Sequence, residues 1–142
     1  MSKNIKRFLS LWVPVMLLCV IIFYCSSIPD LSIKQLGIWD LIFRKIAHFT
    51  EFGILALLLY RAIKGSTNWS TRKVFFWAIF WTIVYAVTDE YHQYFVPSRI
   101  TSAYDVLIDS AGGIFWTMFY IIGKQRKTLE SETNNETDKK QN

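Results

Sequence analysis

The feature that most constrains this chain is an uncharged apolar segment of 18 residues at positions 8–25, FLSLWVPVMLLCVIIFYC. As a helix with a rise of about 1.5 Å per residue it would span about 27 Å, close to the hydrocarbon thickness of a bilayer. Lys3, Lys6 and Arg7 precede it, as basic residues precede the apolar part of a signal peptide. That part is usually only about 7 to 15 residues long. We therefore expect residues 8–25 to be retained as a membrane anchor.

Three further apolar segments follow at about residues 43–63, 74–91 and 103–123. Hydrophobic residues make up 52% of the 142 residues, which is a high share for a soluble domain. The pattern predicts an all-α fold, a polytopic bundle of four transmembrane helices within residues 1–123. Residues 124–142 hold one aliphatic residue in 19 and cannot bury a core, so we expect a disordered tail there.

Lysine and arginine residues predict the orientation of this bundle, because short cytoplasmic loops carry an excess of them. If the N-terminus is cytoplasmic, twelve of the 16 lie in the inner segments. Only four, Lys34, Arg44, Lys45 and Arg99, lie in the outer segments. Both termini and the tail at residues 124–142 should therefore be cytoplasmic. The same topology accounts for the net charge of +5, so we expect no nucleic-acid partner.

Aromatic residues make up 17% of the chain and predict contacts with lipid and with other helices. Trp12 and Trp69 are expected near helix ends, where aromatic side chains commonly form an interfacial belt. Trp77 and Trp81 belong to an apolar segment without interleaved basic residues, so it does not resemble a base-stacking platform. We therefore expect the aromatic side chains to serve packing and lipid contact.

The last three apolar segments also carry polar residues near the end that should face outward. On a helical wheel the polar side chains of each segment share one face, at i, i+3 and i, i+4 spacings. A charged side chain at the centre of a membrane helix costs about 2.5 to 3.5 kcal/mol, so these faces should turn toward one another. The result would be a polar pocket at the extracytoplasmic face. Its residues are Arg44, Lys45, His48 and Glu51; Asp89, Glu90, His92 and Gln93; and Asp105 and Asp109.

Two neighbouring features favour the same pocket. The loop at residues 95–104 would cap it and carry Arg99 to its rim. Gly112 and Gly113 follow Asp109 on the same side of the fourth segment, and glycine lets a neighbouring membrane helix approach closely. Opposite charges that meet in the pocket would offset part of the free energy lost when each leaves water.

The polar residues also form ordered motifs: Lys45-x-x-His48, Asp89-Glu90-x-x-Gln93, Phe95-Val-Pro-Ser-Arg99 and Asp105-Val-Leu-Ile-Asp109-Ser-Ala-Gly112. With Ser26-Ser-Ile-Pro29 after the first segment, they resemble the VanZ-like family of bacterial membrane proteins, from about residue 8 to 123. The resemblance implies a multi-pass protein of the bacterial cytoplasmic membrane. That family is named for a protein associated with resistance to teicoplanin, a lipid-tailed glycopeptide, so the resemblance also implies antibiotic resistance at the cell envelope.

The resemblance implies less about chemistry than about fold, and three interpretations stay open. In the first, the pocket binds a membrane lipid, a lipid-linked cell-wall precursor or a lipoglycopeptide, without a cofactor. The planar guanidinium of arginine suits a phosphate group, and lysine would add a point charge. The candidate binding residues are Lys45, Asp89, His92, Gln93 and Arg99.

In the second interpretation the protein is a membrane-embedded enzyme that acts on a lipid-linked substrate. Glu90 would form an acid/base pair with Asp105 or Asp109, and His48 and His92 would carry protons. We expect no metal, because the two histidines lie on different segments and no HExxH motif occurs. In the third interpretation the charges only fix the register of the helices, and the protein is an interaction or scaffold component.

Overall fold

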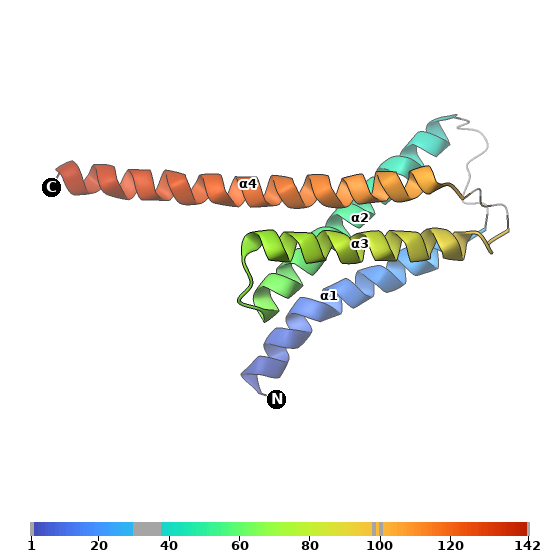
Figure 1. The fold of residues 1–142 in the computed structure, drawn as a ribbon, viewed down its shortest axis with the longest axis horizontal. Helices are drawn as coiled ribbons and strands as arrows, with labels where there is room; N and C mark the ends of the chain where they lie inside the picture. The colour runs from blue at the N-terminus through green and yellow to red at the C-terminus, as the bar shows by residue number, and fades with distance from the viewer. Residues whose placement is uncertain (1, 30–37, 98, 100, 142) are drawn as a thin grey trace.

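The computed structural model describes residues 2–29, 38–97, 99 and 101–141, apart from the side chains at 40, 41 and 135–141, so Lys34 lies outside the described residues. The described residues form four α-helices and no strand: α1 Lys3–Ser26, α2 Ile38–Ser66, α3 Thr71–Gln93 and α4 Ala103–Gln141 (Figure 1). The predicted all-α fold is confirmed. In the described part, three stretches are long and apolar enough to cross a membrane: α1, Ile42–Ser66 of α2 and Ala103–Asn134 of α4.

The fourth helix, α3, has a shorter apolar stretch. Its uncharged residues run from 74 to 88, which is 15 residues or about 22 Å of helix. Lys73 precedes this stretch, and its N–H donates to the side chain of the N-cap residue Ser70 at 3.4 Å. Asp89 follows it, still inside the helix. The last turn of α3 therefore carries charged and polar side chains while it is still packed in the bundle.

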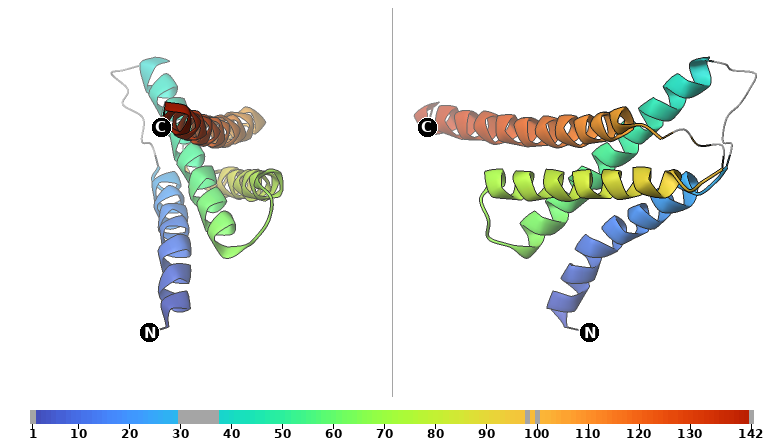
Figure 2. Two further views of the ribbon diagram at one scale, coloured as in Figure 1. Left: turned by 90° about the vertical axis from the view of Figure 1, so that its left-hand side faces the viewer. Right: turned by 45° about the vertical axis from the view of Figure 1, so that its right-hand side comes forward.

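The helices alternate in direction along the chain (Figures 1 and 2). α2 packs against each of the other three helices, and α3 also packs against α1 and α4. α1 and α3 end, and α2 and α4 begin, on one side of the molecule, which we call the polar end. The opposite side, where α2 leads into α3, we call the tryptophan end. α1 and α3 lie together at the polar end and diverge toward the tryptophan end.

The core lies where α2 passes between the other helices. Phe52, Leu55 and Ala62 of α2 are fully buried, with no exposed surface. They pack with buried side chains of α1 and α3, namely Val15, Ile22, Val74, Ala78 and Ala86. The outer surfaces of the helices carry exposed apolar side chains, as expected where helices contact lipid. Examples are Met16, Leu17, Val20, Phe115, Phe119 and Ile122.

Gly112 allows α4 to lie directly against the backbone of α2. A Cβ at position 112 would run into the backbone carbonyl of Phe49, and backbone cannot move aside as a flexible side chain can. At the neighbouring Gly113, a Cβ would stand 3.1 Å from Thr82 and 3.3 Å from Ala56. The structure thus contains the close helix contact that was expected at these two glycines.

Beyond the bundle, α4 continues as a helix to Gln141, far past the other helices (Figure 1). The described side chains at residues 122–134 are all exposed. The helix gains a local ion pair, since Arg126 Nε lies 2.9 Å from Glu130 Oε1 at i, i+4 spacing. The exposure of these side chains agrees with the expectation that the tail buries no core. That residues 124–142 are disordered and cytoplasmic stays a prediction.

The contact at Gly112 gives a prediction about stability. Gly112→Ala should lower the free energy of unfolding by about 1 to 3 kcal/mol, because the added methyl group overpacks a backbone contact. Thermal unfolding of the purified protein in detergent, followed by circular dichroism, would measure this. Gly123→Ala is the matched control, since nothing lies within 4 Å of a Cβ there. Equal unfolding temperatures for the two variants would contradict the close contact.

Candidate functional site

At the polar end, a buried hydrogen-bonded group joins the last turns of α1 and α3. The Ser26 hydroxyl donates to Asp89 Oδ2 at 2.9 Å. Gln93 Nε2 donates to the same oxygen at 2.8 Å and to Ser26 Oγ at 3.2 Å. Ser26, Asp89 and Gln93 are 2%, 4% and 6% exposed. We call these three residues the Asp89 network; it fixes the end of α1 against α3.

His92 makes a second connection between the same two helices. Its Nε2 lies 2.9 Å from Ser27 Oγ, and its ring stacks on Phe23 with centroids 4.2 Å apart. The Ser27 hydroxyl donates to the carbonyl of Phe23 at 2.6 Å, so Ser27 Oγ can accept a hydrogen bond from His92 when Nε2 is protonated. His92 therefore packs against α1.

Arg99 fastens the loop between α3 and α4 to the end of α1. Its Nη2 donates to the carbonyl oxygens of Cys25 at 3.2 Å and Ile28 at 3.4 Å. A cation is favourable here, because the last carbonyls of a helix carry partial negative charge. Burial, and then the nearby charge of Arg44, lower the pKa of the Arg99 guanidinium. One end of the guanidinium expected to bind an anion is thus already used by backbone carbonyls.

The first turn of α4 is held by one residue from α3 and one from α2. Glu90 Oε1 accepts a hydrogen bond from the backbone N–H of Ser102, just before α4 begins. A carboxylate suits this place, because the N-terminus of a helix carries partial positive charge. Lys45 Nζ forms an ion pair with Asp105 Oδ1. Glu90, Lys45 and Asp105 therefore have partners within the bundle.

Asp109, one turn further along α4, is placed differently. Its side chain is only 5% exposed, and His48 Nδ1 is 3.9 Å from its Oδ1, too far for a hydrogen bond. Within the described residues, Asp109 Oδ1 is buried without a hydrogen-bond donor, as is Asp89 Oδ1. The charges of Asp89, Asp105, Glu90 and Glu51 all act on the Asp109 carboxyl group. The five acids of the predicted pocket therefore do gather around one place.

The structure brings the polar faces of α2, α3 and α4 together as expected, and it adds α1. The sequence interpretation did not include Ser26 or Ser27 as partners, although both belong to the Ser26–Pro29 motif that contributed to the family resemblance. The cluster contains five carboxylates, from Glu51, Asp89, Glu90, Asp105 and Asp109, against three fixed cations, Arg44, Lys45 and Arg99. In the described part of the chain, no group of three or more His, Cys, Asp or Glu residues could hold a metal ion.

Comparison with known proteins identifies the family but not a characterised relative. The chain matches the family model described as VanZ/LLP1 over residues 4–124, which includes all four helices up to the point where α4 leaves the bundle. No curated protein and no solved structure matches it. The matched region contains the Asp89 network, Arg99 and the Asp105–Asp109 turn described above. On this match over most of its length, the chain belongs to the VanZ/LLP1 family.

Proposed function

We propose that this chain is a four-span protein of the bacterial cytoplasmic membrane, with both termini in the cytoplasm and its polar end outside. The alternating helix directions and the excess of lysine and arginine in the inner segments support this orientation. α3 spans with the others, because it packs against α1, α2 and α4. Because its apolar stretch is short, Asp89 and Glu90 would lie near the outer surface, beside their hydrogen-bond partners Ser26 and Ser102.

At that surface the polar end binds the headgroup of a lipid-linked molecule, either a cell-wall precursor or a lipoglycopeptide. The observation that carries this proposal is the pair of buried oxygens, Asp89 Oδ1 and Asp109 Oδ1, which lack donors in the described part. Burying a polar oxygen without a hydrogen-bond donor costs about 1 to 3 kcal/mol of stability, and burying a charged one costs more. A ligand that supplies donors would recover this free energy, so the pair marks a place for one.

The charges indicate which part of a headgroup binds there. Five carboxylates face three fixed cations, so the site favours a positive group such as an ammonium, whose three N–H donors would suit two carboxylate oxygens. Lys45 is less available for an anion, since it already contacts Asp105. Arg99 uses Nη2 on the α1 carbonyls, while its buried Nε has no acceptor in the described part. By holding such molecules at the membrane surface, the protein would alter the response to glycopeptides such as teicoplanin.

A second candidate function is acid/base catalysis on the bound lipid. It is favoured by the His48–Asp109 pair, in which a carboxylate lies 3.9 Å from an imidazole nitrogen. Catalytic hydrogen bonds are often long before the substrate binds and shorten in the complex, so Asp109 would then accept from His48. Glu90 and Asp105 suit this role less well, since each is bound by a neighbour. His48 would then be the proton carrier, and Asp109 would orient it.

The proposed orientation predicts the behaviour of reporter fusions. Green fluorescent protein fused after Gly65 should fluoresce, and alkaline phosphatase at the same point should be inactive, because the α2–α3 connection is cytoplasmic. After Thr101 both results should reverse. These two fusions act as controls for each other. An active phosphatase after Gly65 would show that the orientation is wrong.

The Asp89 network predicts a loss of stability when one donor is removed. Ser26→Ala leaves Asp89 Oδ2 with a single donor and should lower the free energy of unfolding by about 1 to 3 kcal/mol. Unfolding in detergent, followed by tryptophan fluorescence, would measure it. Thr88→Val is the matched control, because the exposed Thr88 hydroxyl donates only to Tyr85 of its own helix, at 2.7 Å. If both variants unfold like the wild type, the network does not stabilise the fold.

The binding proposal predicts a specific defect in a variant that remains folded. Asp109→Asn keeps the size of the side chain but removes its charge, so binding of an ammonium group should weaken by about tenfold to a hundredfold. The wild type and the variant, in nanodiscs, would be incubated with lipid-linked cell-wall precursors, and the retained lipid would be measured by mass spectrometry. Ser110→Ala serves as the control, since the Ser110 hydroxyl donates to Val106 within α4.

The same assay distinguishes the two candidate functions. Retention of an unaltered precursor by the wild type, reduced in Asp109→Asn, supports binding. A chemically altered lipid that disappears in His48→Gln supports catalysis. If neither retention nor alteration depends on Asp109 or His48, the charges of the polar end serve only the fold.

A further inference from the structure

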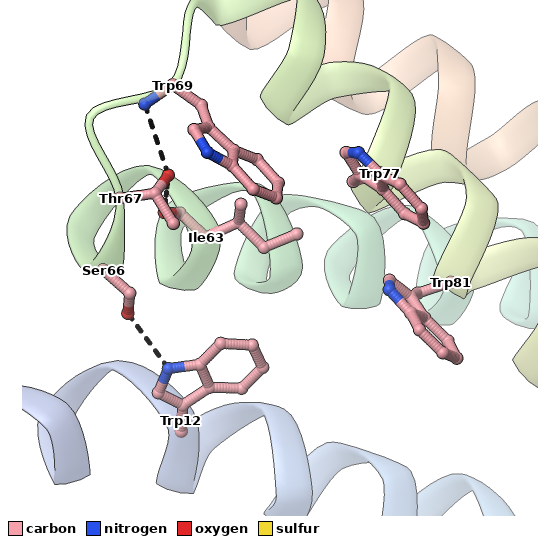
Figure 3. A pocket seen from close by; sticks show the side chains of 7 residues that line it. All are labelled: Trp12, Ile63, Ser66, Thr67, Trp69, Trp77 and Trp81. Carbon is pink, nitrogen blue, oxygen red and sulfur yellow. Dashed lines mark hydrogen bonds between the residues drawn. The ribbon is translucent and has the colours of Figure 1, made fainter.

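The tryptophan end contains a cavity that the proposed function does not use. Its volume is about 300 Å³, and it lies where α1 and α3 diverge beside the end of α2. Figure 3 shows four indole rings arranged around it, with the side chain of Ile63 from α2 between them. The lining includes Trp12, Trp69, Trp77 and Trp81, together with the hydroxyl residues Ser66 and Thr67.

The walls of this cavity are held in place by hydrogen bonds between its own lining residues. The Trp12 indole N–H donates to Ser66 Oγ at 3.1 Å, which connects α1 to the end of α2 (Figure 3). The backbone N–H of Trp69 donates to Thr67 Oγ1 at 3.4 Å. The Trp69 ring also lies beside Trp77 of α3, with centroids 6.5 Å apart. Three parts of the chain thus form the cavity without a ligand, in an otherwise apolar setting.

Two lysines lie beside the cavity, and both contact Trp69 of its lining. Lys64 Nζ donates to the backbone carbonyl of Trp69 at 2.8 Å, and Lys73 Nζ lies 4.2 Å from the centre of its ring. The surrounding sequence offers no acid to neutralise them, because residues 1–29 and 52–88 contain no Asp or Glu but seven Lys or Arg. The nearby start of α3, at Thr71, adds partial positive charge. This rim therefore suits an anionic group.

We propose that the tryptophan end binds an anionic glycerophospholipid, with part of an acyl chain in the cavity and the phosphate beside Lys64 and Lys73. The apolar indole walls suit a hydrocarbon chain, and about 300 Å³ matches the smaller ligand pockets of proteins. A free phosphate would leave the cavity unfilled, and an uncharged lipid would leave the two lysines without an anion. Both parts of the site are satisfied together by one amphipathic molecule.

Native mass spectrometry of the full chain tests this proposal. The protein would be released from nanodiscs that contain equal amounts of phosphatidylglycerol and phosphatidylcholine, and the retained lipids would be counted. We expect the wild type to retain phosphatidylglycerol. Lys64→Gln with Lys73→Gln should lower this retention about tenfold or more, because both basic residues beside the anionic headgroup lose their charge. Lys127→Gln on the exposed part of α4 should retain lipid like the wild type.

A second pair of variants tests the apolar part of the site. Trp81→Ala removes one wall of the cavity and should reduce retention, whereas Phe76→Ala, which removes another exposed aromatic ring of α3 outside the cavity, should not. Equal retention of the two lipids, or equal effects of the lysine variants and Lys127→Gln, would overturn the proposal. A lipid-free dimer would also overturn it, because a second copy would then cover the cavity. None of these results depends on a ligand at the polar end.

Discussion

The arrangement of the polar end depends on the free energy needed to bury Asp89. A carboxylate removed from water is strongly destabilising unless donors surround it. Ser26 and Gln93 supply two donors to one of its oxygens, at 2.9 and 2.8 Å. Because Ser26 belongs to α1 and Asp89 to α3, satisfying this carboxylate also fixes where α1 ends. The carbonyls at that end then lie within reach of Arg99, which positions the loop that leads into α4.

The two ends of the bundle therefore differ in kind. The polar end gathers carboxylates from three helices and connects them to serine, glutamine and lysine side chains. The tryptophan end has lysine and indole side chains, and residues 52–88, which form much of it, contain no Asp or Glu. The two ends of the bundle therefore present chemically different surfaces.

Periodicity in the sequence predicted the helices and the meeting of their polar faces. The third and fourth apolar segments correspond to α3 and α4, and their polar residues lie at the predicted ends of these helices. A charged side chain in an apolar helix has few favourable orientations. The roles of Ser26 and Arg99 could not be predicted in the same way. A serine hydroxyl at the end of an apolar helix lowers stability little in any orientation. An arginine in a loop has many possible hydrogen-bond acceptors. The cavity depends on how far α1 and α3 diverge, which no local pattern encodes.

Asp89 and Asp109 are both buried aspartates on apolar helices. Their hydrogen-bond partners differ because different helices pack against them. α1 contacts α2 and α3, and in the described part it makes no contact with α4, so its serine can reach Asp89 and not Asp109. α2 does face Asp109, but its Lys45 is paired with Asp105 one turn away, and His48 stands 3.9 Å off. In the described part of the bundle, Asp109 Oδ1 therefore has no hydrogen-bond donor. The same residue type on two apolar helices thus acquires different partners, because each aspartate faces different helices.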